Sequence, residues 1–486
     1  TMLTACFDDS DDDGVSVPAI NMEKAQLVVN TNANIAKAAY SDSLKTAEDL
    51  KVAIAAFKAE AEKANGDRND VTAAALLTAA KKAWLVSREP YGQTEVYRFR
   101  PTPIEDNVNT TEGEDGPEGA LNAWPLGEAL IDYVKTGDDF GAAEIGVTSH
   151  GVGSELTTSI DTGNASASAA SNTNTIIGNR NITIDDALLE TSESGAGNDV
   201  ISGYHAIEFL LWGQDLNDAG QVTTDDSRDE AIKTGNFSHG GQRPLTDFTT
   251  DTNADRRHDF LEVAVNKLIA DLTQVSTQWT AGTTDSYYDA FTTLTSEADA
   301  KQKLTEILTG MGTLSEGELA GERMQIAFSA NSQEDEHSCF SDNTHRDIWL
   351  NAEGVSNSYF GQYTGYDADL DPSTVDVTTN AVDGYGIYDY LQDVGLGSLA
   401  ATTKTALETT ETNYTAIDTD ARNNKPFDVL IMDENRTADS SVAKTIISLN
   451  AQATSIQDAA NALGLGTVVD EDASSCNTNS PDTACE

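Results

Sequence analysis

The sequence predicts an all-α protein in which two antiparallel helical bundles pack together and carry long polar insertions. Three observations support this fold class. Apolar residues recur every three to four positions in several long segments, the strict alternation typical of strands is absent, and two Gly/Ser/Thr/Asn-rich stretches interrupt the helical pattern. We expect the first insertion to contain short strands around residues 175–183.

The chain has 486 residues, which is long enough for two or more domains. The predicted order is a lipobox and flexible acidic tether at 1–20, an N-terminal bundle at 21–250 with insertions at 136–197 and 217–250, a C-terminal bundle at 251–465, and a polar tail at 466–486.

The N-terminal helices follow from local pattern. Residues 21–64 are expected to form two helices, the second starting after Ser43, and residues 70–98 form a third that Pro90 should kink or break. Residues 121–135 and the apolar run that begins at Gly203 give two more. The remaining helical patterns cover residues 252–280, 285–311, 314–332, 383–420 and 440–463.

The charge balance is strongly acidic, with 81 Asp and Glu against 29 Lys and Arg and a net charge of −52. Nucleic acid is therefore not an expected partner, because phosphate binding needs clustered Lys and Arg. The excess of carboxylates favours solubility and attracts cations. Adaptation to a saline environment explains the same composition without any ion-binding function.

The cysteines indicate an oxidising envelope compartment. Leu3-Thr4-Ala5-Cys6 is similar to a bacterial lipobox, which predicts lipidation of Cys6 and anchoring on the periplasmic or cell-surface side, with the outer membrane as the expected site. Cys476 and Cys485 close a short loop that suits a disulfide. Cys339 is expected to be a small buried residue. No stretch approaches the roughly 20 apolar residues of a transmembrane helix.

The run GYHAIEFLLWGQD, residues 203–215, places His205 and Glu208 three positions apart in an apolar segment. On a helix these residues share one face. A buried carboxylate is costly unless it is paired or bound to a metal, and imidazole with carboxylate suits iron, zinc or manganese better than calcium or magnesium. A structural His–Glu pair explains the same spacing, and two ligands are not a complete site.

A second polar segment, residues 87–101, is the best source of further ligands. Its chemistry-bearing residues recur at spacings of three and four, on one helical face: Arg88, Tyr91, Glu95 and Arg98. A surface salt-bridge ladder is the alternative interpretation.

A third segment, residues 314–347, concentrates ligand-type side chains, namely Glu318, Glu322, Asp335, His337, Asp342 and His345. Gly321 and Met324 indicate close packing there. Ser341, Asp342 or Asn343 is expected to cap a following helix. A buried hydrogen-bonded turn is the alternative to a binding role.

Taken together, five motifs resemble those of the imelysin-like proteins, which are bacterial periplasmic or lipid-anchored proteins also described as insulin-cleaving metalloproteases. In this chain they read SREPYGQTEVYRF, LNAWPLGEALIDYV, GYHAIEFLLWGQDL, GELAGERM and DEHSCFSDNTH. The resemblance implies a two-bundle fold with the functional site near the domain interface.

The family signature G-x-H-x-x-E falls on Gly203, His205 and Glu208. The chain is also similar to the metal-binding domain of periplasmic iron-uptake proteins, whose Tyr-x-x-x-Glu segment aligns with Tyr91 and Glu95. The resemblance therefore implies a metal site of His205, Glu208 and Glu95 with a further ligand undecided. Its expected supporting residues are Gly203, Arg88, Tyr91, Arg98, Glu322, Asp335 and His337.

Three functions fit these observations. The first is a lipid-anchored protein that binds a metal, iron before zinc, and acts in iron uptake with an outer-membrane or periplasmic partner. The second is a zinc-type metallopeptidase, although neither H-E-x-x-H nor H-x-x-E-H is present and Phe209 stands where a second His would be needed. The third is a non-catalytic protein that binds a membrane or haem-protein complex through its insertions.

Overall fold

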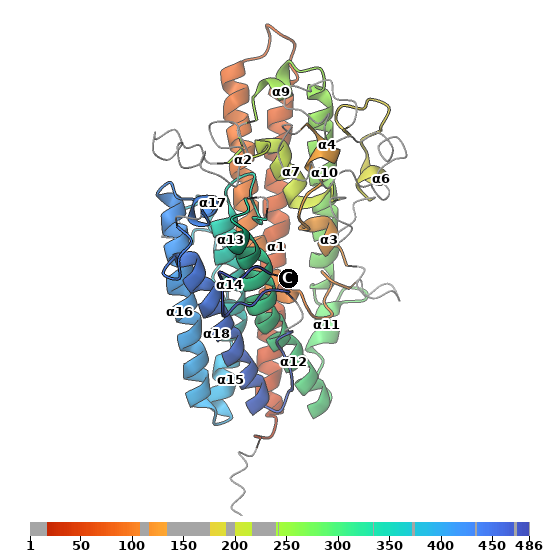
Figure 1. The fold of residues 1–486 in the computed structure, drawn as a ribbon. Helices are drawn as coiled ribbons and strands as arrows, with labels where there is room; N and C mark the ends of the chain where they lie inside the picture. Colours follow the sequence, from red (N-terminus) through yellow and green to blue (C-terminus); the bar gives the residue numbers. More distant parts are fainter. Residues whose placement is uncertain are drawn as a thin grey trace, which may run out of the picture.

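In a computed structural model of the chain, the residues described are 17–106, 116–133, 175–190, 200–215, 240–241, 243–333, 335–371, 375–432, 435–470 and 474–485. They form an elongated bundle whose long helices run broadly along one axis (Figure 1). The predicted all-α class is confirmed. Cys6, the tether up to residue 16 and most of both predicted insertions lie outside the described residues.

Helix α1 (Met22–Ala61) runs through the middle of the bundle (Figure 1). It contacts α2 (Asp70–Gly92), α10 (Ala254–Gln278) and α12 (Glu297–Thr313). Ala25, Val28 and Val29 are fully or almost fully buried in these contacts, as an apolar stripe with helical period requires. The division into two bundles near residue 250 stays a prediction.

The later part of the chain adds long helices to the same bundle. α12 continues directly into η3 (Leu314–Gln325), a π-helix, and α14 (Thr344–Phe360) follows. α18 (Ser441–Ala462) packs against α16 (Gly397–Arg422), η3 and α12. Single π-turns are common inside helices at functional sites, whereas a π-helix of this length is rare.

Shorter elements connect these helices: η1 (Glu95–Tyr97), α3 (Glu118–Leu121), α4 (Glu128–Ile131), α6 (Asp186–Leu189), α7 (Gly203–Trp212), α9 (Thr246–Thr249), α11 (Tyr287–Thr292), α13 (Ile326–Ala330), α15 (Ile387–Asp393) and α17 (Phe427–Leu430). The strands β1 (Gln362–Tyr363) and β2 (Val382–Asp383) pair antiparallel, with Gln362 opposite Asp383.

Several local predictions were wrong. Helix α2 continues through Pro90 and ends at Gly92, so Glu95 and Arg98 do not share its face and lie in η1 and at the C-terminal end of η1. Residues 22–61 form one helix rather than two, because the Ser43 hydroxyl donates to the Ala39 carbonyl inside the helix instead of capping a new one. The expected helix at 121–135 is replaced by α3 and α4, single turns on either side of a cis Trp124–Pro125 bond. Residues 175–183 form turns, and the strand pair lies at 362–363 and 382–383.

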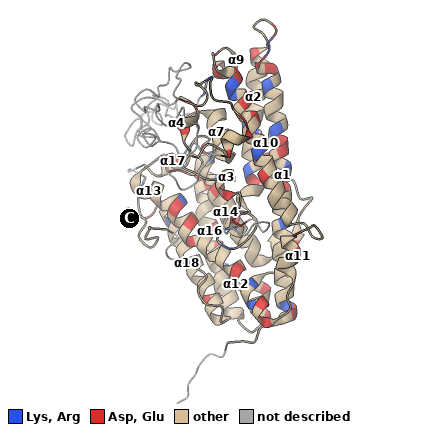
Figure 2. Ribbon diagram, turned by 90° about the vertical axis from the view of Figure 1, so that its right-hand side faces the viewer, with Lys and Arg blue, Asp and Glu red and all other residues tan. Residues whose placement is uncertain are grey.

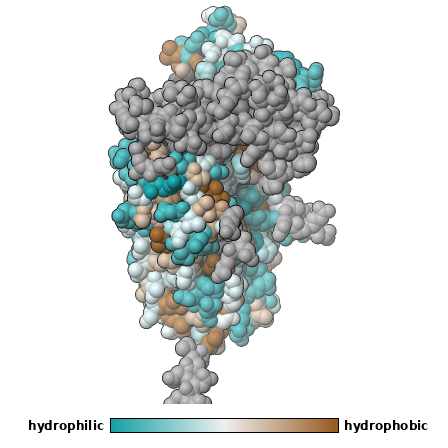
Figure 3. All heavy atoms as spheres, viewed as in Figure 1, coloured by the Kyte–Doolittle hydropathy of each residue, from teal (hydrophilic) through white to brown (hydrophobic). Residues whose placement is uncertain are grey.

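The described surface is mixed in character. Figure 2 shows Asp and Glu on the long helices towards both ends of the bundle. Figure 3 shows hydrophobic residues on the viewed face as separate spots among hydrophilic ones. Among the described helices, none is long and apolar enough to cross a membrane.

Candidate metal centre

Helix α7 presents His205 and Glu208 to the interior. His205 Nδ1 lies 2.8 Å from Glu208 Oε2, and both side chains are buried. The predicted i,i+3 pairing is therefore present. The other oxygen, Glu208 Oε1, accepts hydrogen bonds from the Ser341 backbone N–H at 2.9 Å and from the Ser341 hydroxyl at 2.6 Å. Glu208 thus holds the imidazole of His205 from one side.

Gly203 makes this placement possible. Its φ is +81°, a conformation that favours glycine. A Cβ at this position would lie 2.6 Å from the carbonyl oxygen of Ala120 and still closer to that of Leu121. The glycine of the G-x-H-x-x-E motif therefore lets α7 begin in direct backbone contact with α3.

A second imidazole–carboxylate pair faces the first. His337 Nδ1 lies 2.8 Å from Asp347 Oδ2 on α14, and the rings of His337 and His205 are 4.8 Å apart and nearly perpendicular. Asp347 also accepts from Ser338 and, at 3.0 Å, from Arg88. In each pair the carboxylate contacts Nδ1, which leaves the Nε2 of His205 to bind something else, whereas the Nε2 of His337 lies 3.4 Å from the Asn122 amide nitrogen.

The two imidazoles line one small cavity of about 10 Å³. Its remaining lining residues are Trp124, Pro125, Leu126, Glu128, Glu336, Cys339 and Phe340. A space of this size is close to what a single water or ion needs. The Nε2 atom of His205 is buried and has no hydrogen-bond partner among the described residues, which is unusual for a buried ring nitrogen.

Glu95 lies in the same polar network but not against His205. It is buried in η1 and accepts from Arg323 at 2.8 Å and from the Asn122 amide at 3.2 Å. Asn122 in turn lies 3.4 Å from His337 Nε2 and accepts from Arg88 at 2.6 Å. Asn122 therefore connects Glu95 to the imidazoles.

The pKa shifts separate the buried groups that are charged at neutral pH from those that are neutral. Burial raises the pKa of Glu95, but Arg323 and Arg98 outweigh burial and bring that pKa to about 2. Burial, with Arg88 adding to it, lowers the pKa of His205 to about 3. Burial raises the pKa of Glu208 to about 8. His205 is therefore a neutral imidazole at physiological pH, which is the form that binds metals.

A wider, acidic pocket lies on the outer side of Trp124 and Pro125, which line both spaces. We call it the outer pocket. It encloses about 400 Å³ and is further lined by Arg98, Glu118, Ala123, Glu318, Glu322, Ile326 and Asp335. Trp124 and Pro125 therefore form a wall that the outer pocket and the small cavity share.

The π-helix η3 brings the outer pocket and the buried network together. Glu318 and Arg323 are five residues apart, the spacing of backbone hydrogen bonds in a π-helix, and Arg323 Nε donates to Glu318 at 3.2 Å. Arg98 reaches Glu95, Glu105, Glu118 and Glu318 at 2.8–3.4 Å. The charged residues of segment 87–101 therefore take part in a buried ion network. They do not form the surface salt-bridge ladder that was the alternative interpretation.

The remaining predicted supporting residues are placed around this network. Tyr91 is fully buried beside Tyr204, with ring centroids 4.7 Å apart. Glu322 and Asp335 line the outer pocket, and burial raises the pKa of Glu322 to about 7. His345 lies apart from the cavity, with Nδ1 at 3.0 Å from the Asp342 carbonyl.

A cluster of three buried aspartates lies near the candidate centre. Asp215, Asp342 and Asp428 are buried and offer carboxylate oxygens within 4.8 Å of one another, and Asp342 adjoins the Ser341 that holds Glu208. Among the described residues, no such group of three includes His205. The predicted ligand set of His205, Glu208 and Glu95 stays a prediction.

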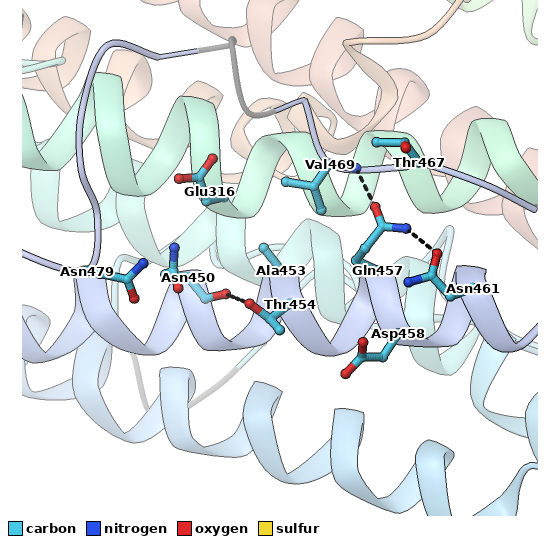
Figure 4. Close-up of a pocket in the computed structure, with 10 residues that line it drawn as sticks. All are labelled: Glu316, Asn450, Ala453, Thr454, Gln457, Asp458, Asn461, Thr467, Val469 and Asn479. Carbon is cyan, nitrogen blue, oxygen red and sulfur yellow. Dashed lines mark hydrogen bonds between the residues drawn. The ribbon is translucent and has the colours of Figure 1, made fainter.

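A larger pocket of about 590 Å³ lies where α18 meets η3 and the C-terminal tail (Figure 4). Its amides bond to one another: Gln457 donates to Asn461 at 2.9 Å and accepts from the Val469 N–H at 3.2 Å. Cys476 and Cys485 form a disulfide in this tail. The pocket is lined mostly by amide and hydroxyl side chains, together with the carboxylates of Glu316 and Asp458, and it contains no imidazole, so it is a poorer candidate for a metal site with histidine ligands.

A family model described as Imelysin matches residues 36–456. The chain belongs to the imelysin family. The resemblance inferred from its motifs is thereby confirmed. No curated protein sequence matches the chain.

Two solved structures share the imelysin fold. A protein proposed to be an iron-regulated protein A precursor, from Parabacteroides distasonis ATCC 8503, is 16% identical with a TM-score of 0.55, and the match covers 92% of this chain and 97% of that one. An imelysin-like protein from Psychrobacter arcticum 273-4 is 14% identical with a TM-score of 0.50, covering 93% and 100%. These likenesses show the fold.

Sequence reasoning missed several members of this candidate site. From the sequence, Asn122, Asp347 and Arg323 had no assigned role in the site, and Ser341 had only the role of a helix cap. Each lies in one of the five quoted motifs or directly beside one. The available signal was therefore membership of these motifs, since local pattern alone does not distinguish these residues.

Proposed function

We propose that this imelysin-family protein binds a divalent metal ion, Fe²⁺ before Zn²⁺, at the small cavity between His205 and His337, and that it serves iron acquisition. The observation that carries the proposal is the buried, unpartnered Nε2 of His205 beside a cavity of about 10 Å³. Histidine nitrogen with carboxylate oxygen is a donor set that suits Fe²⁺ and Zn²⁺.

In this arrangement the residues of the signature take different roles. His205 is a ligand through Nε2, because Glu208 occupies Nδ1 at 2.8 Å. A carboxylate on the far nitrogen of a metal-binding histidine fixes the tautomer and ring orientation. Asp347 does the same for His337 at 2.8 Å. Glu208 therefore orients a ligand, and Glu128 or Glu336, which line the cavity, would supply the carboxylate oxygen.

The outer pocket provides a route for the ion. Its Glu118, Glu318 and Glu322 lie around Arg98 in a space of about 400 Å³. Clustered carboxylates raise the local concentration of cations. Movement of the half-buried Trp124, which lines both spaces, would open the shared wall.

The geometry favours binding over peptide hydrolysis. A zinc peptidase keeps an open position for water and substrate at the metal. The cavity beside His205 has room for about one small ion, and the His205 side chain is 2% exposed. The choice of iron as the metal is supported by the family resemblance and by the solved structure of a protein proposed to be iron-regulated. Lipid anchoring and an envelope partner remain part of this proposal.

Metal titration of purified protein tests the proposal. Chelator-treated protein should bind about one Fe²⁺ under anaerobic conditions, or one Zn²⁺, by isothermal titration calorimetry. His205→Ala and His337→Ala should each weaken binding by at least about 100-fold, and Glu208→Ala by about 10–100-fold because an orienting carboxylate is lost.

His258 offers a matched control for this experiment. It is also fully buried, has a depressed pKa of about 4 caused mainly by burial, and lies on α10 with Nε2 at 2.9 Å from the Phe248 carbonyl. His258→Ala should destabilise the fold but leave metal affinity unchanged. Equal affinities in the wild type, His205→Ala and His337→Ala would refute the metal centre.

A further inference from the structure

A loop after β1 gathers three aspartates that the proposed metal centre does not use. Asp367, Asp369 and Asp376 offer carboxylate oxygens that all lie within 4.8 Å of one another. Backbone hydrogen bonds of 3.1 and 3.2 Å between Tyr366 and Val377 close the loop around them. We call these three residues the aspartate loop.

Asp367 carries the observation that points to a ligand. Its side chain is buried, with the residue only 5% exposed, and Oδ1 accepts from the N–H groups of Asp369 and Leu370 at 3.0 and 2.6 Å. The other oxygen, Oδ2, is buried without a hydrogen-bond partner. Burial is the main reason that the pKa of Asp367 rises to about 6, and Glu89 and the adjacent carboxyl of Asp369 add to it.

No described Lys or Arg nitrogen lies within ion-pair distance of the aspartate loop. Arg422 comes near, but its guanidinium donates to the Leu370 carbonyl at 2.9 Å and to Asp418 at 2.7 Å. Converging carboxylates repel unless a cation lies between them. The described structure therefore holds three carboxyl groups close together, and one buried oxygen among them has no hydrogen-bond partner.

We propose that Asp367, Asp369 and Asp376 bind a Ca²⁺ ion. The donors are all carboxylate oxygens, the ligand type of hard cations. Aspartates at 367, 369 and 371 have the spacing of the first three ligand positions in calcium-binding loops. The loop is not an EF-hand, because Thr378 stands where the bidentate Glu would be, and Asp376 supplies the distal carboxylate.

Calcium fits better than magnesium. Mg²⁺ demands near-ideal octahedral geometry, whereas Ca²⁺ accepts flexible arrangements that water completes. Asp369 and Asp376 are exposed, so solvent reaches the ion from one side while Asp367 holds it from the buried side. An exposed site with few protein ligands implies an affinity typical of extracellular modules, on the order of 10⁻⁴–10⁻³ M.

Calcium titration of the full chain after chelator treatment tests this inference. We expect a one-site binding isotherm with CaCl₂, a weaker response to MgCl₂, and a rise in the unfolding temperature with Ca²⁺. Asp369→Asn and Asp376→Asn replace an exposed carboxylate with an amide of the same shape, so the fold should be retained, and each should weaken Ca²⁺ binding about tenfold or more. Asp367→Asn should abolish measurable binding.

Asp383→Asn is the matched control, since it removes one exposed negative charge on the neighbouring β2. An equal loss of affinity in Asp383→Asn and Asp369→Asn would overturn the site and indicate general charge attraction. Absence of any Ca²⁺ response in the wild type would also overturn it, leaving a proton shared by Asp367 and Asp369 as the explanation of the geometry.

His205→Ala separates this inference from the proposed metal centre. The variant should keep the Ca²⁺ isotherm while it loses Fe²⁺ or Zn²⁺ binding. Loss of Ca²⁺ binding in His205→Ala would place the ion at the other centre and refute the aspartate loop. Failure of the Fe²⁺ titration alone would leave the calcium site standing.

Discussion

Replacing Gly203 with alanine should destabilise the fold and disturb the candidate metal centre together. The φ of +81° costs a non-glycine residue about 1 kcal/mol. The new Cβ would also lie 2.6 Å or less from two α3 carbonyl oxygens, those of Ala120 and Leu121. Because these are backbone atoms, they cannot rotate away, and the overlap should cost about 2 kcal/mol more. We expect a total loss of about 3 kcal/mol in the free energy of unfolding.

Gly395 separates the two contributions. Its φ is +86°, but a Cβ there would meet no atom within 4 Å. Gly395→Ala should therefore cost only about 1 kcal/mol in urea denaturation. Metal titration should show weakened binding in Gly203→Ala, since α7 must shift and carries His205, and normal binding in Gly395→Ala. Equal stability losses in the two variants would refute the argument from backbone contact.

Two further perturbations follow from the structure. Burial, with Glu411 adding to it, raises the pKa of Glu353 to about 7 from an ordinary value of 4.5. The folded state then binds the proton more tightly, so this carboxyl costs stability as pH rises from 4.5 through 7. Glu353→Gln should be about 2 kcal/mol more stable than wild type near pH 8, and equal to it near pH 4, in urea denaturation; a gain independent of pH would contradict this. Replacing Cys476 and Cys485 with serine should lower the unfolding free energy by about 2–3 kcal/mol in thermal denaturation, as reduction of the wild type should, and leave metal binding intact.

The sequence predicted best where a short segment determines its own structure. The spacing of His205 and Glu208 predicted a shared helix face, and the two side chains are 2.8 Å apart. Gly321 was expected at a close packing point, and a Cβ there would collide with the Ser474 side chain. Disagreements arose where two local outcomes were both possible: Ser43 suits a cap as well as a mid-helix position, and only the continuous packing of α1 decides between them.

The rest of the site could not be predicted because its contacts are distant in sequence. Ser341 meets Glu208 across 133 residues, and Arg88 meets Asp347 across 259. Local periodicity contains no information on such pairs. It also gave no indication that residues 314–325 would form a π-helix, on which Glu318 and Arg323 are brought together.

The charges of the buried network explain why a cation would be held beside His205 in particular. Arg88 is paired with Asp347 at 3.0 Å, and Arg323 with Glu95 at 2.8 Å. Glu208, by contrast, has no described Lys or Arg within ion-pair distance, and its partner His205 is a neutral imidazole. A buried carboxylate in that position is costly as an anion, unless positive charge lies on the far side of the imidazole. A metal ion on the Nε2 of His205 would place positive charge on that side. In the proposed centre, His205 would therefore link Glu208 to the metal.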